Sequence, residues 1–166
     1  MTTFYDVPAE NLIPALSVKL GSEHGINMPE WAAFVKTGVH RERPPVQNDW
    51  WVTRSAAILR KVAREGPVGV NHLSQSFGGR VERGSAPNRA ASGSRHIIRT
   101  ILQQLEEAGL VEKSATKVLD STDDDGERIT LYAGRKITSS GHKLLDSTAH
   151  EVREQVEASH PGMEKY

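Results

Sequence analysis

The sequence contains no cysteine, which excludes a disulfide framework, a thiolate metal site and a cysteine nucleophile. It also lacks a run of about 18 apolar residues, the length that a helix needs to cross a bilayer. The first residues, MTTFYDVPAENL, show no basic segment followed by an apolar one and so do not resemble a secretory signal. We therefore expect a soluble, intracellular protein, and 166 residues suit one domain with extensions.

Catalytic and metal-binding motifs are also lacking. There is neither a phosphate-binding P-loop nor a glycine-rich dinucleotide fingerprint. The seven histidines show no HExxH pattern or comparable ligand spacing, and we interpret them as surface residues. The segment STDDDGE has part of an EF-hand pattern, but Ser121 stands where the loop should begin and Tyr132 where its bidentate glutamate should be. The sequence therefore predicts no enzyme activity, no metal and no cofactor.

The net charge of zero conceals an uneven distribution. Residues 36–105 contain 12 Lys and Arg but only 4 Asp and Glu, a balance of +8. Residues 1–35 have a balance of −3, and residues 106–166 have one of −5. A basic middle between acidic ends predicts one surface that binds a polyanion, with random scatter of the charges as the simpler alternative.

Hydrophobic periodicity predicts a mostly helical chain. The expected helices start near Pro8, Pro29, Asp49, Val70 and Ser92 or Ser94, and a long last helix lies in residues 137–159. Asp6 and Asp49 are the expected N-caps of the first and third helices. The strongest apolar stripe, in the helix after Ser94, consists of Ile97, Ile98, Ile101, Leu102, Leu105 and Ala108. Two β-like segments, residues 110–119 and 127–133, flank the acidic turn DSTDDDG and predict a hairpin.

The segment NDWWVTRSAAILRKVAREG places two adjacent tryptophans at the start of one expected helix. At about 100° per residue, Trp51 falls on the apolar face and Trp50 on the opposite, basic face. The basic face also carries Arg54, Arg60, Lys61 and Arg64, without a carboxylate partner. We expect Trp51 in the core and Trp50 at least partly exposed, where it could stack on an unpaired base. The alternative is that Trp50 packs beneath the N-terminal helices.

Residues 80–94, RVERGSAPNRAASGS, have almost no large apolar side chains. They carry Arg80, Arg83 and Arg89 among glycine, proline and serine, a composition typical of an exposed loop. Because nothing apolar there would order the segment without a partner, we expect a mobile basic loop that contacts a polyanion.

From residue 50 onward the expected order is helix, short helix, helix, hairpin and helix. This order indicates a mostly α fold class, a winged helix (a helix-turn-helix with a β-hairpin wing) plus extra N-terminal helices. Residues 1–150 form this single expected domain, and residues 151–166 are the end of the last helix and a tail. Such folds bind nucleic acids more often than they catalyse reactions. A winged-helix DNA-binding transcription regulator is one alternative, although it would need a dimerisation element.

Several long motifs, in this order, resemble the ribosomal protein S19e family of archaeal and eukaryotic small subunits. They are MPEWAAFVKTGVHRERPP, DWWVTRSAAILRKV, GPVGVNHLSQSFGGR, RGSAPNRAASGSRHIIRTILQQLEEAGLVEK and GRKITSSGHKLLD. The resemblance covers residues 4–150, and Ser139 stands where the family usually has proline. It implies a winged-helix-like protein of the small-subunit head that binds ribosomal RNA and supports subunit maturation and translation. Neighbouring small-subunit ribosomal proteins are further implied partners.

Together with the charge pattern, the resemblance implies an RNA-binding surface centred on the basic helix and the basic loop. The residues expected to bind RNA are Trp50, Arg54, Arg60, Lys61, Arg64, Gly79, Arg80, Arg83, Arg89, Ser94, Arg95, Arg99, Arg135 and Lys136. Asp123, Asp124 and Asp125 would repel phosphate, which argues against an RNA contact by the wing tip at residues 120–127. We expect a cytoplasmic monomer within the ribosome that has no membrane partner.

Overall fold

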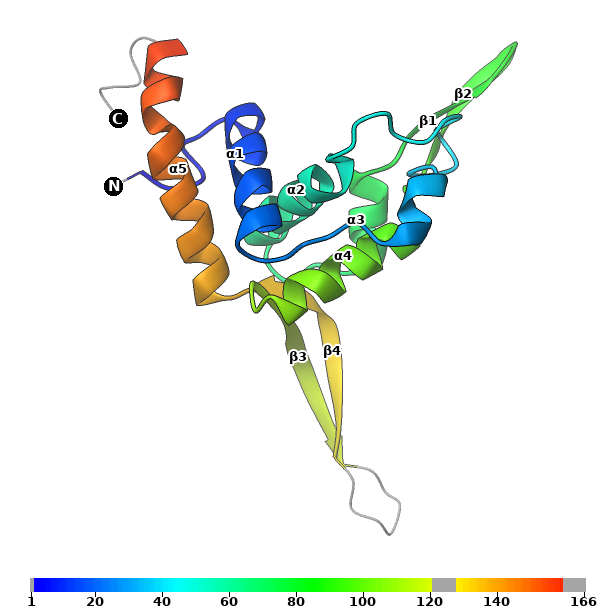
Figure 1. The fold of residues 1–166 in the computed structure, drawn as a ribbon. Coiled ribbons are helices and arrows are strands. Elements are labelled where there is room, and N and C mark those ends of the chain that lie inside the picture. The colour runs from blue at the N-terminus through cyan, green and yellow to red at the C-terminus, as the bar shows by residue number, and fades with distance from the viewer. Residues whose placement is uncertain (1, 121–127, 160–166) are drawn as a thin grey trace.

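The computed structural model describes residues 2–120 and 128–159 and consists mainly of helices (Figure 1). Its helices are α1 (Ala9–Ser22), the 3-10 helix η1 (Glu30–Phe34), α2 (Trp50–Glu65), α3 (Val70–Ser76), α4 (Arg95–Glu107) and α5 (Ser139–Ser159). Its strands are β1 (Gly79–Arg83), β2 (Ala86–Ala91), β3 (Val111–Asp120) and β4 (Arg128–Ile137), which pair as two antiparallel hairpins. The prediction of a mostly α-helical chain is therefore confirmed.

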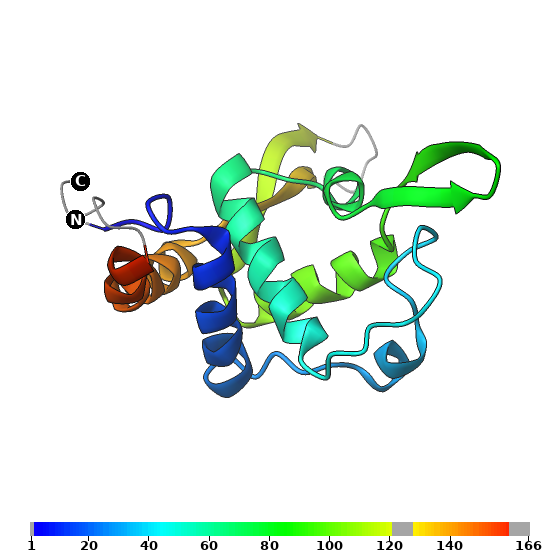
Figure 2. The same ribbon diagram turned by 90° about the horizontal axis from the view of Figure 1, so that it is seen from above.

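The helices pack around one apolar core. Seen from above, α2 and α4 cross the middle of the molecule, with α1 and α5 on one side and α3 and the β1–β2 hairpin on the other (Figure 2). The core is filled by fully buried side chains from four helices, among them Leu12, Leu16, Leu20, Ile58, Leu59, Val62, Ile101, Leu102, Leu105 and Leu145. Burying each such side chain contributes about 1.5–3 kcal/mol. Among the described helices, none combines the length and the apolar character needed to cross a membrane.

Trp51 lies in this core, as predicted. It is fully buried, and its indole Nε1 donates a hydrogen bond to Oε1 of Gln104 on α4 at 2.9 Å. Its ring meets that of Trp31 edge-on, with ring centroids 5.6 Å apart. Because a buried indole N–H without a partner would destabilise the fold, this hydrogen bond helps to fix α2 against α4.

The helix starts agree only in part with the predicted caps. Ser94 caps α4 as predicted, since its Oγ accepts a hydrogen bond from the backbone N of Ile97 at 3.5 Å. Asp49 occupies the N-cap position of α2, as predicted, but its side chain makes no cap hydrogen bond. Asp6 is not an N-cap, since Pro8 holds that position in α1. Asp6 instead accepts hydrogen bonds from the backbone N and the Oγ1 of Thr3, at 2.7 and 2.8 Å, and these bonds lower the pKa of its carboxyl.

The β1–β2 hairpin occupies most of residues 80–94, so the prediction of a loop there is wrong. Its strands pair from Gly79 opposite Ala91 at the base toward the turn. Alanine, arginine and glycine replace the alternating apolar residues by which strands are recognised, so the pairing depends mainly on the backbone. The base of the hairpin also needs glycine, because a Cβ on Gly78 would lie 2.3 Å from the carbonyl oxygen of Ala91.

The β3–β4 hairpin confirms the one hairpin that the sequence predicted. Its register runs from Val111 opposite Ile137 at the base to Asp120 opposite Arg128, and the acidic residues 121–127 lie outside the described residues. Backbone hydrogen bonds of 2.9 and 3.0 Å between Val68 and Arg135 attach its base to the segment after α2. From there the hairpin extends away from the helices (Figure 1).

The last helix, α5, packs against α1. Leu145, Thr148, Val152 and Val156 are buried along it. An ion pair of 2.7 Å joins Nζ of Lys19 on α1 to Oε1 of Glu151 on α5. The N-terminal residues and α5 therefore close one side of the core, opposite the β1–β2 hairpin.

Candidate nucleic-acid interface

The predicted cations of α2 differ in their surroundings. Arg64 is exposed, whereas Arg54, Arg60 and Lys61 are partly buried. Nζ of Lys61 lies 3.0 Å from Oε1 of Glu65, one turn further along the helix, so the expectation that this face lacks a carboxylate partner is wrong. A solvent-accessible pair of this kind contributes only about 0.3–0.5 kcal/mol. Lys61 can therefore still exchange Glu65 for a phosphate.

Trp50 is buried, with 8% of its surface exposed, so the expectation of an exposed ring on the basic face is wrong. Its ring meets that of Trp51 edge-on, with centroids 5.3 Å apart and an angle of 80° between the planes. The structure agrees with the alternative interpretation, since α1 packs along α2 and Trp50 belongs to the same core cluster. A helix covered on two sides can bury neighbouring residues, which helical periodicity alone does not reveal.

Arg54 lies one turn after Trp50, and its guanidinium stacks over the ring of Phe77 at 4.7 Å from the centroid. It forms no hydrogen bond and no ion pair with any residue that the structure describes. Burial, and to a smaller extent the charge of Arg41, lowers the pKa of the Arg54 guanidinium. Arg54 is thus a partly buried cation that faces another cation and no carboxylate.

Arg60, further along α2, also lacks a partner for part of its guanidinium within the described residues. Its Nε is buried without a hydrogen-bond partner in the described part of the chain. Burial and then the charge of Arg64 lower the pKa of Arg60. Because a buried donor without a partner is costly, both arginines are better satisfied with an anion present than without one.

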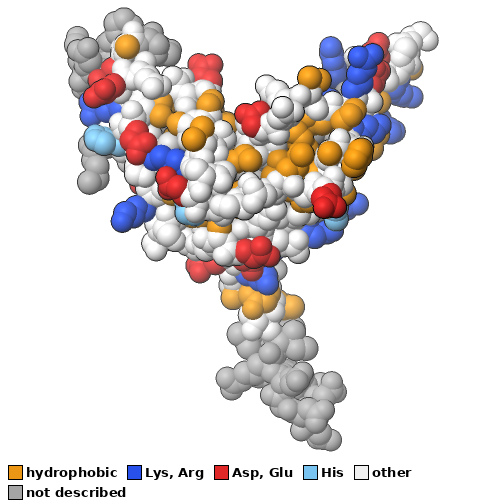
Figure 3. Space-filling view, viewed as in Figure 1, with side chains coloured by type: hydrophobic (Ala, Val, Ile, Leu, Met, Phe, Trp, Pro, Cys, Tyr) orange, Lys and Arg blue, Asp and Glu red, His pale blue; other side chains and the backbone are white. Residues whose placement is uncertain are grey.

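The β1–β2 hairpin carries the predicted arginines of the loop. Arg80, Arg83 and Arg89 are exposed, and among the described residues only Arg83 has a hydrogen bond, from Nη1 to the carbonyl oxygen of Pro87 at 3.4 Å. In the space-filling view, Lys and Arg side chains gather on the arm that ends in this hairpin, with hydrophobic side chains beside them (Figure 3). The hairpin therefore holds these cations well away from the core.

The start of α4 brings the next predicted residues close to the hairpin base. Ser94 caps the helix and its backbone N donates a hydrogen bond of 2.8 Å to the carbonyl oxygen of Thr37. Arg95 and Arg99 are exposed on the first turns of α4. Gly79, at the start of β1, packs against the ring of His40, which leaves no space there for a side chain.

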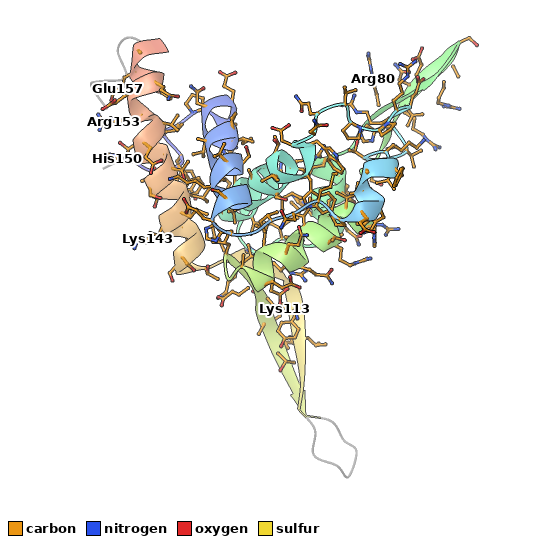
Figure 4. All side chains as sticks on the ribbon, viewed as in Figure 1. Arg80, Lys113, Lys143, His150, Arg153 and Glu157 are labelled. Atoms are coloured by element: carbon orange, nitrogen blue, oxygen red, sulfur yellow. The ribbon has the colours of Figure 1, made fainter. Side chains whose placement is uncertain are left out.

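The last two predicted residues, Arg135 and Lys136, lie elsewhere, on β4. Arg135 Nε donates to Oε2 of Glu106 at 2.9 Å, and Lys136 Nζ lies 3.0 Å from Oε1 of Glu112. Lys113, opposite Arg135 in the register, also pairs with Glu106, at 3.2 Å. In Figure 4, Lys113 marks this end of the molecule and Arg80 the opposite one. Arg135 is bonded through its backbone to Val68, just after the end of α2, and both Arg135 and Lys136 have carboxylate partners.

A groove of about 1010 Å³ lies between α2, the connector that leads to it and the base of the β1–β2 hairpin. It is lined by Trp50, Thr53, Arg54 and Arg80, and by His40, Arg41, Arg43 and Phe77, which are absent from the predicted residues. The ring of His40 is wedged between Gly38 and Gly79. Burial, then the charges of Arg41 and Arg54, lower the pKa of His40. Helical spacing does not predict the path of an irregular connector. Beyond the local charge, the sequence therefore does not indicate that His40, Arg41 and Arg43 line a groove.

Other chemistry finds little support in the side chains. Within residues 2–120 and 128–159 there is no group of three or more His, Asp or Glu side chains that could hold a metal ion. His72 lies 3.2 Å from Glu65, a contact of a surface histidine. What the described side chains offer is therefore an arrangement of cations around a groove.

Comparison with known proteins finds similarity to one family of ribosomal proteins along nearly the whole chain. The family model described as ribosomal protein S19e matches residues 3–155. A protein of Haloarcula marismortui named small ribosomal subunit protein eS19 is 44% identical over 170 aligned positions, which cover 100% of this chain and 99% of that protein. A protein of the same name from Aeropyrum pernix is 39% identical and is covered to 99%. In Schizosaccharomyces pombe, small ribosomal subunit protein eS19B is 35% identical over 92% of this chain and 95% of its own length.

Proposed function

Because the chain belongs to the S19e family of ribosomal proteins, we propose that it is a structural constituent of the small ribosomal subunit that binds ribosomal RNA. The observation that carries the proposal is the lack of carboxylate partners for most of the cations on α2, the β1–β2 hairpin and α4. Among the described residues, no ion pair is formed by Arg54, Arg60, Arg64, Arg80, Arg83, Arg89, Arg95 or Arg99. Cations of this kind bind phosphates and release the condensed counterions of the RNA.

The proposed RNA-binding surface is smaller than the sequence predicted. It comprises α2 from Arg54 onward, the hairpin from Gly79 and the start of α4 from Ser94. Arg135 and Lys136 are left out of it, because they lie on β4, away from the β1–β2 hairpin and the start of α4, and Arg135 is held by Glu106. Trp50 contributes as part of the groove wall and of the core, with little ring surface left for stacking.

The fold supports two further parts of the proposal. The β1–β2 hairpin stands between α3 and α4, and the β3–β4 hairpin follows α4 directly. Helices followed by a hairpin are the element order of a winged helix, and we assign β3–β4 as its wing. The proposed domain is residues 1–150; α5 runs on to Ser159, and the predicted tail lies outside the described residues. The proposed setting is the cytoplasmic ribosome, with neighbouring small-subunit proteins as partners and a part in subunit maturation. Catalysis is not part of the proposal, and family membership favours this role over that of a DNA-binding regulator.

A binding titration against a ribosomal RNA fragment at several salt concentrations tests the proposal. Each phosphate contact should add about −0.7 to −0.9 to the slope of log affinity against log salt. The double variant Arg80→Gln and Arg83→Gln should make the slope shallower by about two contacts. Lys143→Gln removes an exposed cation of α5, on the opposite side of the molecule, and should leave the slope unchanged (Figure 4). A flat slope for the wild-type protein would contradict the proposal.

A further inference from the structure

Arg54 is a cation of the groove that has no anionic partner in the described part of the chain. Its guanidinium is partly buried over the Phe77 ring, with no hydrogen bond or ion pair among the described residues. Stacking on an aromatic ring supplies part of the attraction that water would give, but it leaves every N–H donor of the guanidinium open. A guanidinium in such a place is typical of a site that receives a planar or tetrahedral oxyanion.

A second cation faces the same space. Arg41, on the connector, is near enough to Arg54 to lower its pKa, and both act in the same way on His40. The ring of His40 is held between Gly38 and Gly79, which fixes the connector, and therefore Arg41, against the base of the hairpin. Two arginines brought together by a rigid wall repel each other unless a negative charge lies between them.

Besides arginines, the lining of the groove includes apolar side chains and two carboxylates. Pro44, Pro45, Val39 and the edge of Trp50 form apolar walls beside the two arginines. The two carboxylates of the lining, Glu42 and Glu82, are exposed and form no ion pair with Arg41, Arg43, Arg54 or Arg80 within the described residues. With about 1010 Å³, the groove has room for one nucleotide, and its lining combines arginines with apolar side chains. A base that lies against such a wall must be unstacked, which is how proteins read unpaired RNA.

We propose that this groove binds one unpaired nucleotide of the RNA, with its phosphate between Arg41 and Arg54 and its base against the apolar wall. The inference rests on the proposed RNA-binding function and adds a feature of the ligand, a nucleotide displaced from the stack. The open cations of the hairpin and α4 bind the paired backbone on either side. The groove thereby gives a preference for local RNA structure, which the exposed arginines alone do not give.

The test uses two RNA hairpins that are identical except for a single unpaired nucleotide in the stem of one, made with each of the four bases. Wild-type protein should bind the bulged hairpins at least about tenfold more tightly, since a stacked base and a held phosphate both add to the affinity. Arg41→Gln and Arg54→Gln should each remove most of this preference. Arg41 is exposed, so its substitution leaves the fold intact even if Arg54→Gln loosens the contact with Phe77.

Arg99→Gln is the matched control, because it removes the same charge from the exposed face of α4, outside the groove. It should weaken both hairpins by the same factor and keep the preference. Equal affinity of wild-type protein for paired and bulged hairpins would overturn the inference while leaving the proposed function in place. The inference would also be overturned if Arg99→Gln lost as much of the preference for the bulged hairpin as Arg41→Gln. Absence of binding to both hairpins and to the ribosomal RNA fragment would instead overturn the proposed function as well.

Discussion

Trp50 belongs to the polar side of α2 by helical spacing and to the core by packing. Because its ring is 8% exposed and lies edge-on to Trp51, its removal leaves a cavity beside the most deeply buried tryptophan. Trp50→Ala should lower the free energy of unfolding by about 3–5 kcal/mol, and Trp50→Phe by less. Chemical denaturation measures both values.

Phe34 provides the control, since it is a large aromatic side chain that is 87% exposed. Phe34→Ala should change the free energy of unfolding by no more than about 0.5 kcal/mol. If Trp50→Ala proved as harmless as Phe34→Ala, Trp50 would have to be a surface residue in solution.

Glu106 makes stability depend on pH in the acid range. Burial alone would raise the pKa of its carboxyl, but the hydrogen bonds and charges of Arg135 and Lys113 outweigh burial and hold it below the ordinary 4.5. A carboxyl with a lowered folded pKa stabilises the protein above its unfolded pKa and loses this contribution as the pH falls through the folded pKa. Below about pH 5 the wild-type protein should therefore lose stability more steeply than Glu106→Gln, by about 1 kcal/mol in total.

The neighbouring Glu107 is exposed and forms no ion pair among the described residues, so Glu107→Gln is the matched control for this measurement. Its unfolding free energy should follow the wild-type pH profile. Parallel profiles for all three proteins would show that the Glu106 cluster is not formed in solution.

At the scale of elements, the β1–β2 hairpin depends on a close backbone approach at its base. Gly78→Ala would place a Cβ 2.3 Å from the carbonyl oxygen of Ala91, so the hairpin or α3 must shift. We expect a loss of about 1–3 kcal/mol, the usual cost of overpacking. Gly69→Ala is the control, because nothing lies within 4 Å of a Cβ at that position. Thermal unfolding of the two variants should separate them, and equal melting temperatures would argue against the close approach.

The elements that were predicted correctly have a signal within their own sequence. The apolar stripe of α4, with Ser94 before it, specifies a helix and its start, and the β-like segments around the acidic turn specify β3 and β4. The β1–β2 hairpin has no such pattern, because its strands are held by backbone pairing and by glycine at a crowded base. The predicted cap at Asp6 was wrong because its carboxylate accepts a hydrogen bond from the backbone N of Thr3 instead.

The candidate site was predicted to a similar degree. The arginines of α2, the hairpin and α4 followed from local charge, and of these the structure brings Arg54 and Arg80 together in the groove. His40 and Arg41 were missed because they reach the groove through the path of an irregular connector. Trp50 was predicted to be exposed but is buried. The packing of α1 against α2 is a tertiary contact, which helical spacing does not reveal. In both cases the missing information is which segments pack together, and no periodicity contains it.

For the whole molecule, the β3–β4 hairpin contributes little to the core. The buried apolar residues nearest to it, Leu110 and Val111, lie at its base. Replacing residues 116–131 by an Asn-Gly turn that joins Ala115 to Tyr132, which lie opposite each other, should keep the rest of the fold. The melting temperature should stay within about 4 °C of the wild-type value, equivalent to less than about 1 kcal/mol. RNA affinity should also be unchanged, because the proposed surface lies at the other end.

A noncooperative unfolding transition of this shortened protein would contradict the prediction, since it would mean that the hairpin holds the helices together. Circular dichroism at two wavelengths detects that outcome, because helix and aromatic signals would no longer change at the same temperature.

The unsatisfied guanidinium of Arg54 has a consequence for the fate of the molecule before assembly. Its desolvation weakens the free chain, and an anion that fills the groove removes the penalty, so occupancy and folding stability rise together by thermodynamic linkage. At a ligand concentration of 100 times the dissociation constant, the gain is about 2.7 kcal/mol. If the proposed nucleotide binds there, copies without RNA would open more often and be cleaved first by proteases. An unpaired charge in the free protein would then distinguish unassembled copies from assembled ones.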